Sequence, residues 1–210
     1  MNDVDIKDRI IEGAKELFVR YGVRSITMDD IAHSLGISKK TLYQHYTDKD
    51  DIVTTTLKHY INLRCTEFDS IKAKINNPIE ELVLMSERLK QSIKNANPSM
   101  LFDLQKYHHS AWDLWKTYRS KYMREWLVRN LREGMELGFY REDLNPEIVA
   151  TIRLELIDLG FDQQLFPKDQ FTTTEVQMQL LEHFTQGILT TKGRKLYDKY
   201  RGELLPVDKN

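Results

Sequence analysis

The amino-acid sequence predicts an all-α fold, and three observations lead to this expectation. The chain of 210 residues contains only nine glycines and five prolines, so long stretches pass without a helix-breaking residue. Apolar residues recur at steps of three and four positions in these stretches, which is the spacing of one helix face. The hydrophobic fraction of 40% is large enough to build a core and excludes an intrinsically disordered chain.

Composition also narrows the classes of function. No run approaches the ~20 apolar residues of a membrane span, and the start MNDVDIKDRI is polar, so a cytoplasmic protein without membrane contact is expected. The single cysteine, Cys65, cannot form an internal disulfide and matches no metal-ligand spacing, so neither a metal nor a cofactor is predicted. The net charge is −1, and residues 1–60 carry one acidic residue more than basic ones. DNA binding would therefore depend on where individual cations are placed.

The first three predicted helices are short or moderate in length and have clear boundaries. The first covers residues 6–21 and is followed directly by a glycine that can cap it. Thr27 can cap the second helix, because its hydroxyl accepts hydrogen bonds from exposed backbone amides. The side chain of Asp30, three residues on, can in turn accept from the Thr27 backbone amide. Gly36 then allows a left-handed turn, and Ser38 caps a third helix with the sequence KKTLYQHY. Two short helices are thus predicted to meet at a tight turn.

The remainder of the chain is predicted to be helical, with breaks at NNP, at NPS and at the turn GFYREDLNP. The expected helices cover residues 48–75, 79–95, 99–110, 111–137, 147–165, 174–191 and 192–205.

The segment from Thr27 to Tyr46 has the steric features of a DNA-binding helix-turn-helix. A small residue stands where the two helices touch, a glycine stands at the turn, and apolar residues close the corner: Ala32, Gly36, Ile31, Leu35, Ile37 and Leu42. With Leu42 and Tyr46 inward, Lys40 and Gln44 share the opposite face, at about 100° per residue. Such a polar face can donate hydrogen bonds to bases and phosphates, as a helix in the major groove must.

An ordinary antiparallel helix pair with a solvated face is the alternative for this segment, since helix-turn-helix patterns alone give false matches. Tyr43 favours DNA binding, because an outward aromatic beside two lysines serves no purpose in solubility.

The run AKELFVRYGVRSITMDDIAHSLGISKKTLYQHYTDKDDIV resembles the N-terminal domain of the TetR repressor family, from Ile6 to about Lys58. The resemblance implies phosphate contacts by Thr27, Tyr43, His45 and Lys49, and base contacts by Lys39, Lys40, Thr41 and Gln44, with Ser38 in the same DNA-binding set. Two positions depart from the family pattern: Lys40 stands where many relatives have glycine, and Tyr46 replaces the usual phenylalanine. The resemblance further implies a DNA-binding domain at residues 1–50 and an effector-binding and dimerisation domain at 51–210, linked by the fourth helix.

Large aromatic residues are concentrated between residues 99 and 131. They fit either a bulky core or an apolar pocket with a few polar groups, and the resemblance places the effector there. The candidates for ligand binding are Tyr107, His108, Trp112, Trp115, Tyr118 and Tyr122. A metal or acid–base site at His108 and His109 is disfavoured, because adjacent helical residues point about 100° apart.

The last two long helices carry apolar residues on more than one stripe, which suggests contacts on two sides. One side would face the chain's own core and the other an identical chain, although burial wholly within one monomer is the alternative. The expected dimer interface comprises Ile152, Leu156, Leu180, Leu181, Phe184 and Ile188.

The sequence thus predicts a regulator, not an enzyme: a repressor that binds a palindromic DNA operator as a homodimer and is released by an apolar or aromatic small molecule. An enzyme would need a catalytic or phosphate-binding motif such as GxGxxG, GxSxG or HExxH, and the sequence contains none of these. A helical adaptor that binds an acidic protein through the same polar face is a further alternative.

Overall fold

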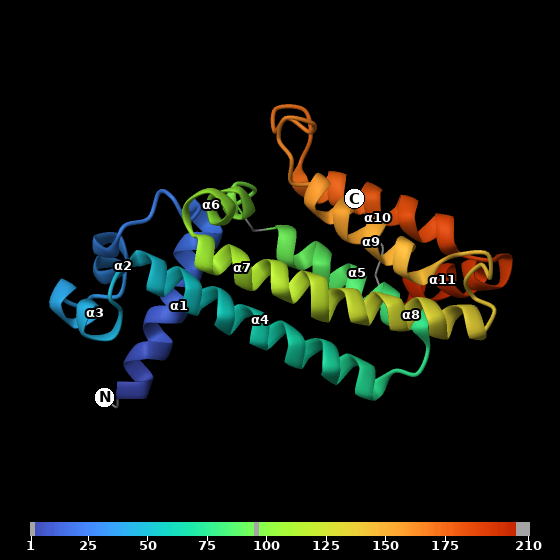
Figure 1. The fold of residues 1–210 in the computed structure, drawn as a ribbon, viewed down its shortest axis with the longest axis horizontal. Helices are drawn as coiled ribbons and strands as arrows, with labels where there is room; N and C mark the ends of the chain where they lie inside the picture. The colour runs from blue at the N-terminus through green and yellow to red at the C-terminus, as the bar shows by residue number, and fades with distance from the viewer. Residues whose placement is uncertain (1–2, 95–96, 205–210) are drawn as a thin grey trace. The chain divides into compact units, whose positions relative to one another are not determined.

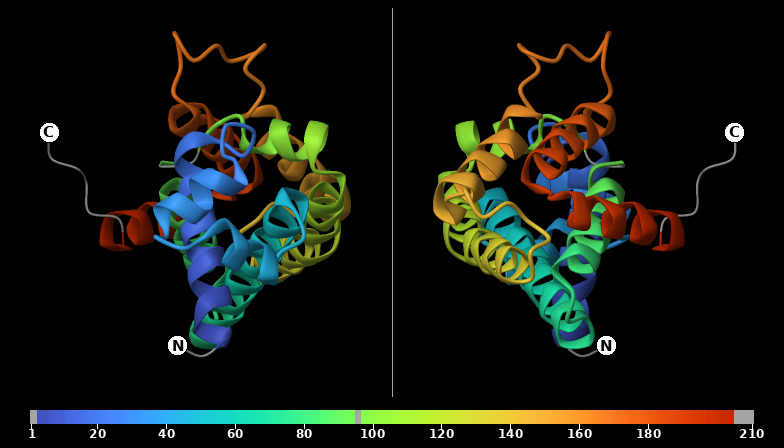
Figure 2. Two further views of the ribbon diagram at one scale, coloured as in Figure 1. Left: turned by 90° about the vertical axis from the view of Figure 1, so that its left-hand side faces the viewer. Right: turned by 90° about the vertical axis from the view of Figure 1, so that its right-hand side faces the viewer.

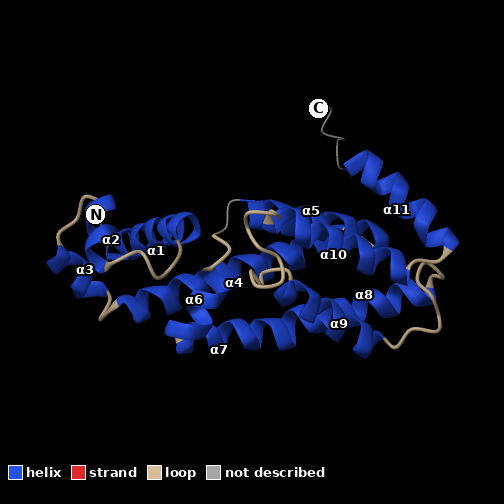
Figure 3. Ribbon diagram, turned by 90° about the horizontal axis from the view of Figure 1, so that it is seen from above, coloured by secondary structure: helices blue, strands red, loops and turns tan. Residues whose placement is uncertain are grey.

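The computed structural model describes residues 3–94 and 97–204. Within these ranges the regular elements are helices, and one isolated β-bridge joins Tyr140 to Leu189 (Figure 3). The all-α prediction is confirmed. The elements are α1 (Asp3–Tyr21), α2 (Met28–Ser34), α3 (Lys39–His45), α4 (Lys49–Lys74), α5 (Pro78–Lys94), α6 (Met100–Tyr107), α7 (His109–Tyr118), the π-helical turn η1 (Arg119–Met123), α8 (Arg124–Glu136), α9 (Pro146–Leu159), α10 (Thr173–Ile188) and α11 (Thr191–Leu204).

The chain forms two compact units. The first comprises Met1–Cys65 and Asn95–Tyr118, and the second comprises Thr66–Lys94 and Arg119–Asn210. The chain therefore passes between the units three times: within α4, after the end of α5, and where α7 gives way to η1. The functional boundary expected at residue 50 stays a prediction, because these units are defined by packing alone.

The core of the first unit joins the N-terminal helices to α6 and α7 (Figure 1). Its buried residues come from α1, α2, α3, the start of α4, α6 and α7, and include Ile10, Phe18, Ile31, Leu42, Ile52, Leu104 and Ala111. Each large apolar side chain removed from water contributes about 1.5–3 kcal/mol. Gly22 ends α1 with a φ of +83°, which favours glycine, and the backbone amide of Asn97 donates to the carbonyl of Val19 at 2.8 Å. The segment leading into α6 is thereby fixed against the end of α1.

The second unit is a helical bundle in which α5 packs against α8, α10 and α11, and α9 packs against both α8 and α10. Its buried apolar residues include Ile79, Val83, Leu131, Tyr140, Leu154, Phe184 and Ile188. A buried carboxylate, Glu81, accepts hydrogen bonds from Trp126 at 2.8 Å, Arg129 at 2.6 Å and Asn130 at 3.0 Å, which ties α5 to α8. The loop between α9 and α10 stands away from the helices of this unit (Figure 2).

Three helix boundaries differ from the sequence-based expectation. The helix expected over residues 111–137 is interrupted by η1, although no glycine or proline lies there to indicate a break. The helix expected over 147–165 ends at Leu159 with Gly160 as its C-cap. His108 separates α6 from α7 with a non-helical φ of −132° and ψ of 69°. Helix boundaries are thus predicted less well from this sequence than the helices themselves.

Candidate nucleic-acid interface and effector region

The turn between α2 and α3 has the geometry expected from its sequence. Thr27 and Asp30 form a capping box: the Asp30 amide donates to the Thr27 hydroxyl oxygen at 3.2 Å, and the Thr27 amide donates to Asp30 Oδ2 at 2.8 Å. Gly36 has a φ of +63°, and the amide of Ile37 donates to the carbonyl of Ala32 at 3.0 Å. These bonds close the corner and set the direction of α3 (Figure 1).

Helix α3 is anchored on one side and open on the other. Leu42 is fully buried and Tyr46, the C-cap residue, is also buried. Ser38 caps the helix, since its hydroxyl accepts from the Thr41 amide at 3.0 Å and lies 2.8 Å from the Thr41 hydroxyl. The residues that face outward are Lys39, Lys40, Tyr43 and Gln44. Half of the Tyr43 surface is exposed, so its ring and hydroxyl are accessible on this face.

Two cations of this region already have partners in the free protein. Lys39 Nζ forms an ion pair with Asp29 Oδ2 at 2.6 Å, and both side chains are exposed. Lys49 Nζ donates to the Arg24 carbonyl at 3.3 Å, which ties the start of α4 to the loop between α1 and α2. Burial lowers the pKa of the Lys49 ammonium from its usual value, against the opposite effect of nearby aspartates. Sequence reasoning did not identify Asp29 as a partner of Lys39.

Buried polar contacts join α6 and α7 to the N-terminal helices. The Arg24 amide donates to Oδ2 of the buried Asp103 at 3.1 Å. The side chain of buried His108 is hydrogen-bonded through Nδ1 to Oδ1 of Asp50, in the first turn of α4. Sequence reasoning missed Asp103 and Asp50; the one available signal was an acid inside the otherwise apolar start of α6, MLFDL.

The six candidate ligand-binding residues are divided between the units. Tyr107 is exposed, with the Arg24 guanidinium 5.2 Å from its ring centroid. Trp112 packs against the core of the first unit, and the rings of Trp115 and Tyr118 lie 5.8 Å apart. Tyr122 belongs to the second unit, where it stacks on Phe68 at 6.2 Å and donates to Asp69 at 2.6 Å. Their role in ligand binding stays a prediction.

The comparisons with known proteins agree with this geometry. Residues 10–55 match the model of bacterial regulatory proteins of the tetR family. The chain is 30% identical to the HTH-type transcriptional regulator YvaF of Bacillus subtilis, over 78% of this chain and 86% of that protein. The chain belongs to the TetR family of transcriptional regulators. The match includes the capped α2, the turn and the outward face of α3.

Two further comparisons extend beyond the DNA-binding segment. The HTH-type transcriptional repressor KstR2 of Mycobacterium tuberculosis is 25% identical to this TetR-family chain over 68% of its length and 73% of the repressor. The crystal structure of a putative transcriptional regulator from Saccharomonospora viridis in complex with choline covers 90% of the chain, and the chain covers all of it, with a TM-score of 0.73 and 22% identity. The helical fold after the DNA-binding segment is therefore shared as well.

The expected dimer residues of this TetR-family chain have different degrees of burial. Leu181, Phe184 and Ile188 are buried within the second unit, whereas Leu156 and Leu180 are half-buried. Ile152 is exposed and shares one face of α9 with two further exposed apolar residues, Ile148 and Leu159, which the expected interface did not include. The spacing of these three residues, four and then seven positions, places them in one outward stripe.

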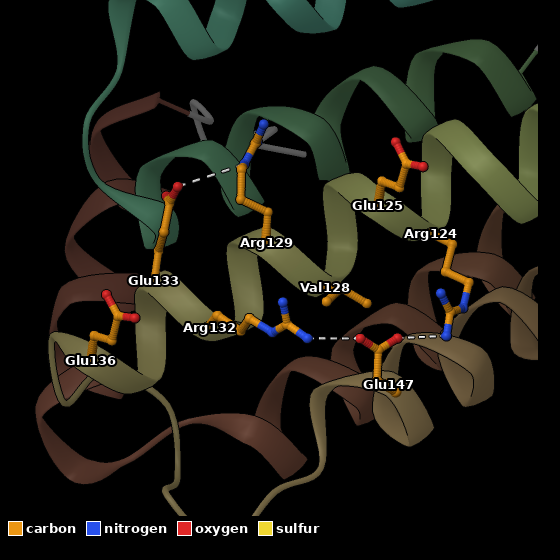
Figure 4. Close-up of a pocket in the computed structure, with 8 residues that line it drawn as sticks. All are labelled: Arg124, Glu125, Val128, Arg129, Arg132, Glu133, Glu136 and Glu147. Carbon is orange, nitrogen blue, oxygen red and sulfur yellow. Dashed lines mark hydrogen bonds and ion pairs between the residues drawn. The ribbon is translucent and has the colours of Figure 1, made fainter.

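A surface groove of about 440 Å³ lies in the second unit and has a mostly charged lining (Figure 4). Its residues are Arg124, Glu125, Val128, Arg129, Arg132, Glu133, Glu136 and Glu147. Glu147 accepts from Arg124 at 2.5 Å and from Arg132 at 2.8 Å, so these charges satisfy one another.

Two other kinds of feature are absent from the described residues. Among residues 3–94 and 97–204, no helix combines the length and the apolar character required to cross a membrane. In the same ranges, no three His, Cys, Asp or Glu side chains gather in a way that could hold a metal ion.

Proposed function

We propose that this TetR-family regulator is a repressor that binds a palindromic operator as a homodimer and is released from it by a small-molecule effector. The observation that carries the DNA-binding part is the outward face of α3, where half-exposed Tyr43 stands among exposed Lys40 and Gln44. The name of the relative KstR2, a transcriptional repressor, supports repression as the mode of action.

The exposed residues divide into two roles on DNA. Lys40 and Gln44 lie four positions apart on α3 and can reach base edges, since lysine donates to guanine and glutamine forms paired hydrogen bonds with adenine. Lys39 and Thr41 flank them. Tyr43 and Lys49, together with Thr27 and His45, would hold phosphates and set the register without reading sequence. Ser38 would contribute mainly by capping α3.

The homodimer follows from the outward stripe of α9. A single helix-turn-helix reads a short half-site, and specific affinity usually comes from two half-sites related by a two-fold axis. Ile148, Ile152 and Leu159 form an exposed apolar stripe that a second copy of the chain would cover. Half-buried Leu156 and Leu180 can extend it. Leu181, Phe184 and Ile188 would support this surface from the core of the second unit.

The effector would be an apolar or aromatic molecule bound next to Trp112, Trp115 or Tyr118, and Tyr122 in the second unit is a separate candidate. Tyr107 and His108 would act differently, because they contact the loop after α1 and the first turn of α4. A displacement of the α6–α7 junction would pull on Asp50 and therefore on α4, which begins directly after the DNA-binding helices. This contact gives the effector a physical route to the DNA-binding surface.

Selection of a binding site from random DNA, followed by gel shift, tests the proposed function. We expect enrichment of a palindrome with half-sites about one helical turn apart and a shift that corresponds to two chains. If no duplex is enriched, the alternative of a protein-binding adaptor is favoured. If a site without two-fold symmetry is enriched, the homodimer on a palindrome is wrong.

Tryptophan fluorescence tests the effector. A panel of apolar compounds, with choline included because the structural neighbour binds it, is titrated into wild type and Trp112→Ala protein, with and without operator. An effector that weakens operator binding by some factor must itself bind more weakly by the same factor when operator is present. Tyr21→Ala, an exposed aromatic residue on α1, is the control and should change neither affinity. Equal affinity with and without operator would contradict effector release.

A further inference from the structure

One buried charge in the second unit has no ion-pair partner among the described residues. Arg153 lies on α9 and is only 3% exposed, yet its nitrogen Nη1 has no hydrogen-bond partner among the described residues. The two acids that follow it on α9 form ion pairs with Arg119, Glu155 at 2.7 Å and Oδ2 of Asp158 at 2.9 Å, while Oδ1 of Asp158 has no partner among the described residues. No ion pair to Arg153 is present within residues 3–94 and 97–204.

An isolated cation in a protein interior is costly, because water no longer solvates it and nothing replaces that solvation. Burial alone lowers the pKa of Arg153 to about 10, so the guanidinium remains charged at neutral pH. Its one described contact is the face of the Phe184 ring, at 5.8 Å from the centroid. A cation–π contact at this distance offsets only a small part of the lost hydration. A bound anion would compensate the rest of the hydration that the guanidinium has lost.

The buried residues of α9 and α10 bear on the chemistry of that anion. Thr185 on α10 is completely buried, and its hydroxyl has no hydrogen-bond partner among the described residues. The other buried residues of these two helices are mostly apolar, including Leu154, Ile157 and Leu181. A single guanidinium balances one negative charge and matches the two oxygens of a carboxylate. A phosphate dianion would leave one charge uncompensated.

We infer that Arg153 binds the carboxylate of an organic acid with an apolar body, inside the second unit between α9 and α10. Resting on the proposed function, we assign this acid as the effector, and its site in the second unit then replaces the position next to Trp112, Trp115 or Tyr118. The ligand class therefore differs from a neutral apolar molecule by its negative charge, and a cationic ligand is excluded from this position. The binding of the acid and the release of DNA are separate steps and can be measured separately.

The test compares wild type with two variants. Arg153→Met keeps a long side chain and removes the charge, and Arg153→Lys keeps the charge but replaces the planar guanidinium with an ammonium group. Thermal unfolding of the full chain is measured alone and with decanoate, phenylbutyrate, decanol and decylamine. Without ligand, Arg153→Met should unfold at the same or a higher temperature than wild type, because an uncompensated buried charge is removed. A lower unfolding temperature would mean that Arg153 has a structural partner, and would overturn the inference.

With ligand, the carboxylates should raise the unfolding temperature of wild type, while decanol and decylamine should have much smaller effects. Calorimetric titration should give about ten- to a hundredfold weaker carboxylate binding by Arg153→Met, since a charge-assisted hydrogen bond is lost. Arg153→Lys should fall between the two. If no carboxylate stabilises wild type more than decanol does, or if wild type and Arg153→Met bind carboxylates equally, buried water suffices to solvate the guanidinium and the inference is wrong.

Operator binding separates this inference from the proposed function. Carboxylates should release operator from wild type and leave the Arg153→Met complex intact. If wild type binds the carboxylates through Arg153 but keeps its operator, the assignment of the acid as effector fails and the binding site stands. If neither protein binds any operator, the proposed function fails independently of the calorimetric result.

Discussion

Replacement of Asp29 by asparagine is expected to strengthen DNA binding while it slightly weakens the fold. In the free protein Asp29 Oδ2 lies 2.6 Å from Lys39 Nζ, and both side chains are exposed. Lys39 begins α3, the helix proposed to enter the major groove, whereas Asp29 lies in the first turn of α2. The lysine must leave this carboxylate before it can bind DNA, and the carboxylate then remains close to the phosphates.

The magnitude follows from two small terms. An exposed ion pair is worth about 0.2–1 kcal/mol, and this is the cost of freeing Lys39. A carboxylate about 7 Å from a phosphate is repelled by about 0.6 kcal/mol in water. Together they give about 1 kcal/mol for each DNA-binding head, or about a fivefold gain in affinity for each half-site. In the opposite direction, the loss of an acid near the start of α2 should cost about 0.3–1 kcal/mol of folding stability.

Fluorescence anisotropy with labelled operator at several salt concentrations measures the affinity, and urea unfolding measures the stability. The salt dependence should become steeper by up to about one phosphate contact for each head, because Lys39 gains access to the backbone. The control is Glu16→Gln, which removes the same charge from an exposed position on α1. Equal gains for Asp29→Asn and Glu16→Gln would show that only total charge matters. Weaker DNA binding by Asp29→Asn would refute the reasoning about Lys39 directly.

Three further predictions concern other parts of the molecule. Lys49→Ala should weaken binding to all DNA sequences and flatten the salt dependence by about one phosphate contact, whereas Gln44→Ala should cost ~1 to 3 kcal/mol of binding free energy mainly at one base pair. Binding-site selection and salt titration distinguish the two variants, and a uniform loss of affinity across DNA sequences for Gln44→Ala would contradict its assignment to a base contact. Ile152→Glu should produce folded monomers that bind operator weakly, as measured by sedimentation, because it places charge in the exposed stripe of α9, and an unchanged dimer would exclude this surface. Asp103→Ala should lower the free energy of unfolding, measured in urea, by about 1–3 kcal/mol, because the Arg24 amide loses its acceptor. Asp113, an exposed ion-pair partner of Lys116, provides the control: Asp113→Ala should change it by less than about 1 kcal/mol, and equal effects of the two variants would contradict a stabilising role of the buried contact.

The helix-turn-helix could be predicted from the sequence in detail because its determinants are local. Thr27 and Ser38 cap helices within three residues of their partners, and Gly36 supplies a backbone conformation that other residues rarely adopt. The period of 3.6 residues then puts Leu42 inside and Lys40 outside. Every one of these relations spans a few positions, so the linear sequence contains them.

The α6–α7 segment shows where such reasoning ends. The aromatic neighbours of His108 predict a place in a ligand pocket, which stays a prediction, whereas its pairing with Asp50, 58 positions earlier in the chain, has no local signal. The π-helical turn at 119–123 interrupts a sequence with good helical periodicity. Neither feature has a local signal, because both depend on which distant groups the folded chain brings together.

For this protein the sequence by itself determined the all-α class, the capped helix-turn-helix and the membership in the TetR family. Only the tertiary structure decided which apolar residues of α9 and α10 are outward: Phe184 and Ile188 complete the chain's own core, while Ile148 and Ile152 remain exposed. It also decided that Lys39 is paired and that Arg153 is buried alone. The physical reason is that periodicity assigns a residue to a face of its helix, whereas the surface or charge opposite that face comes from a different part of the chain.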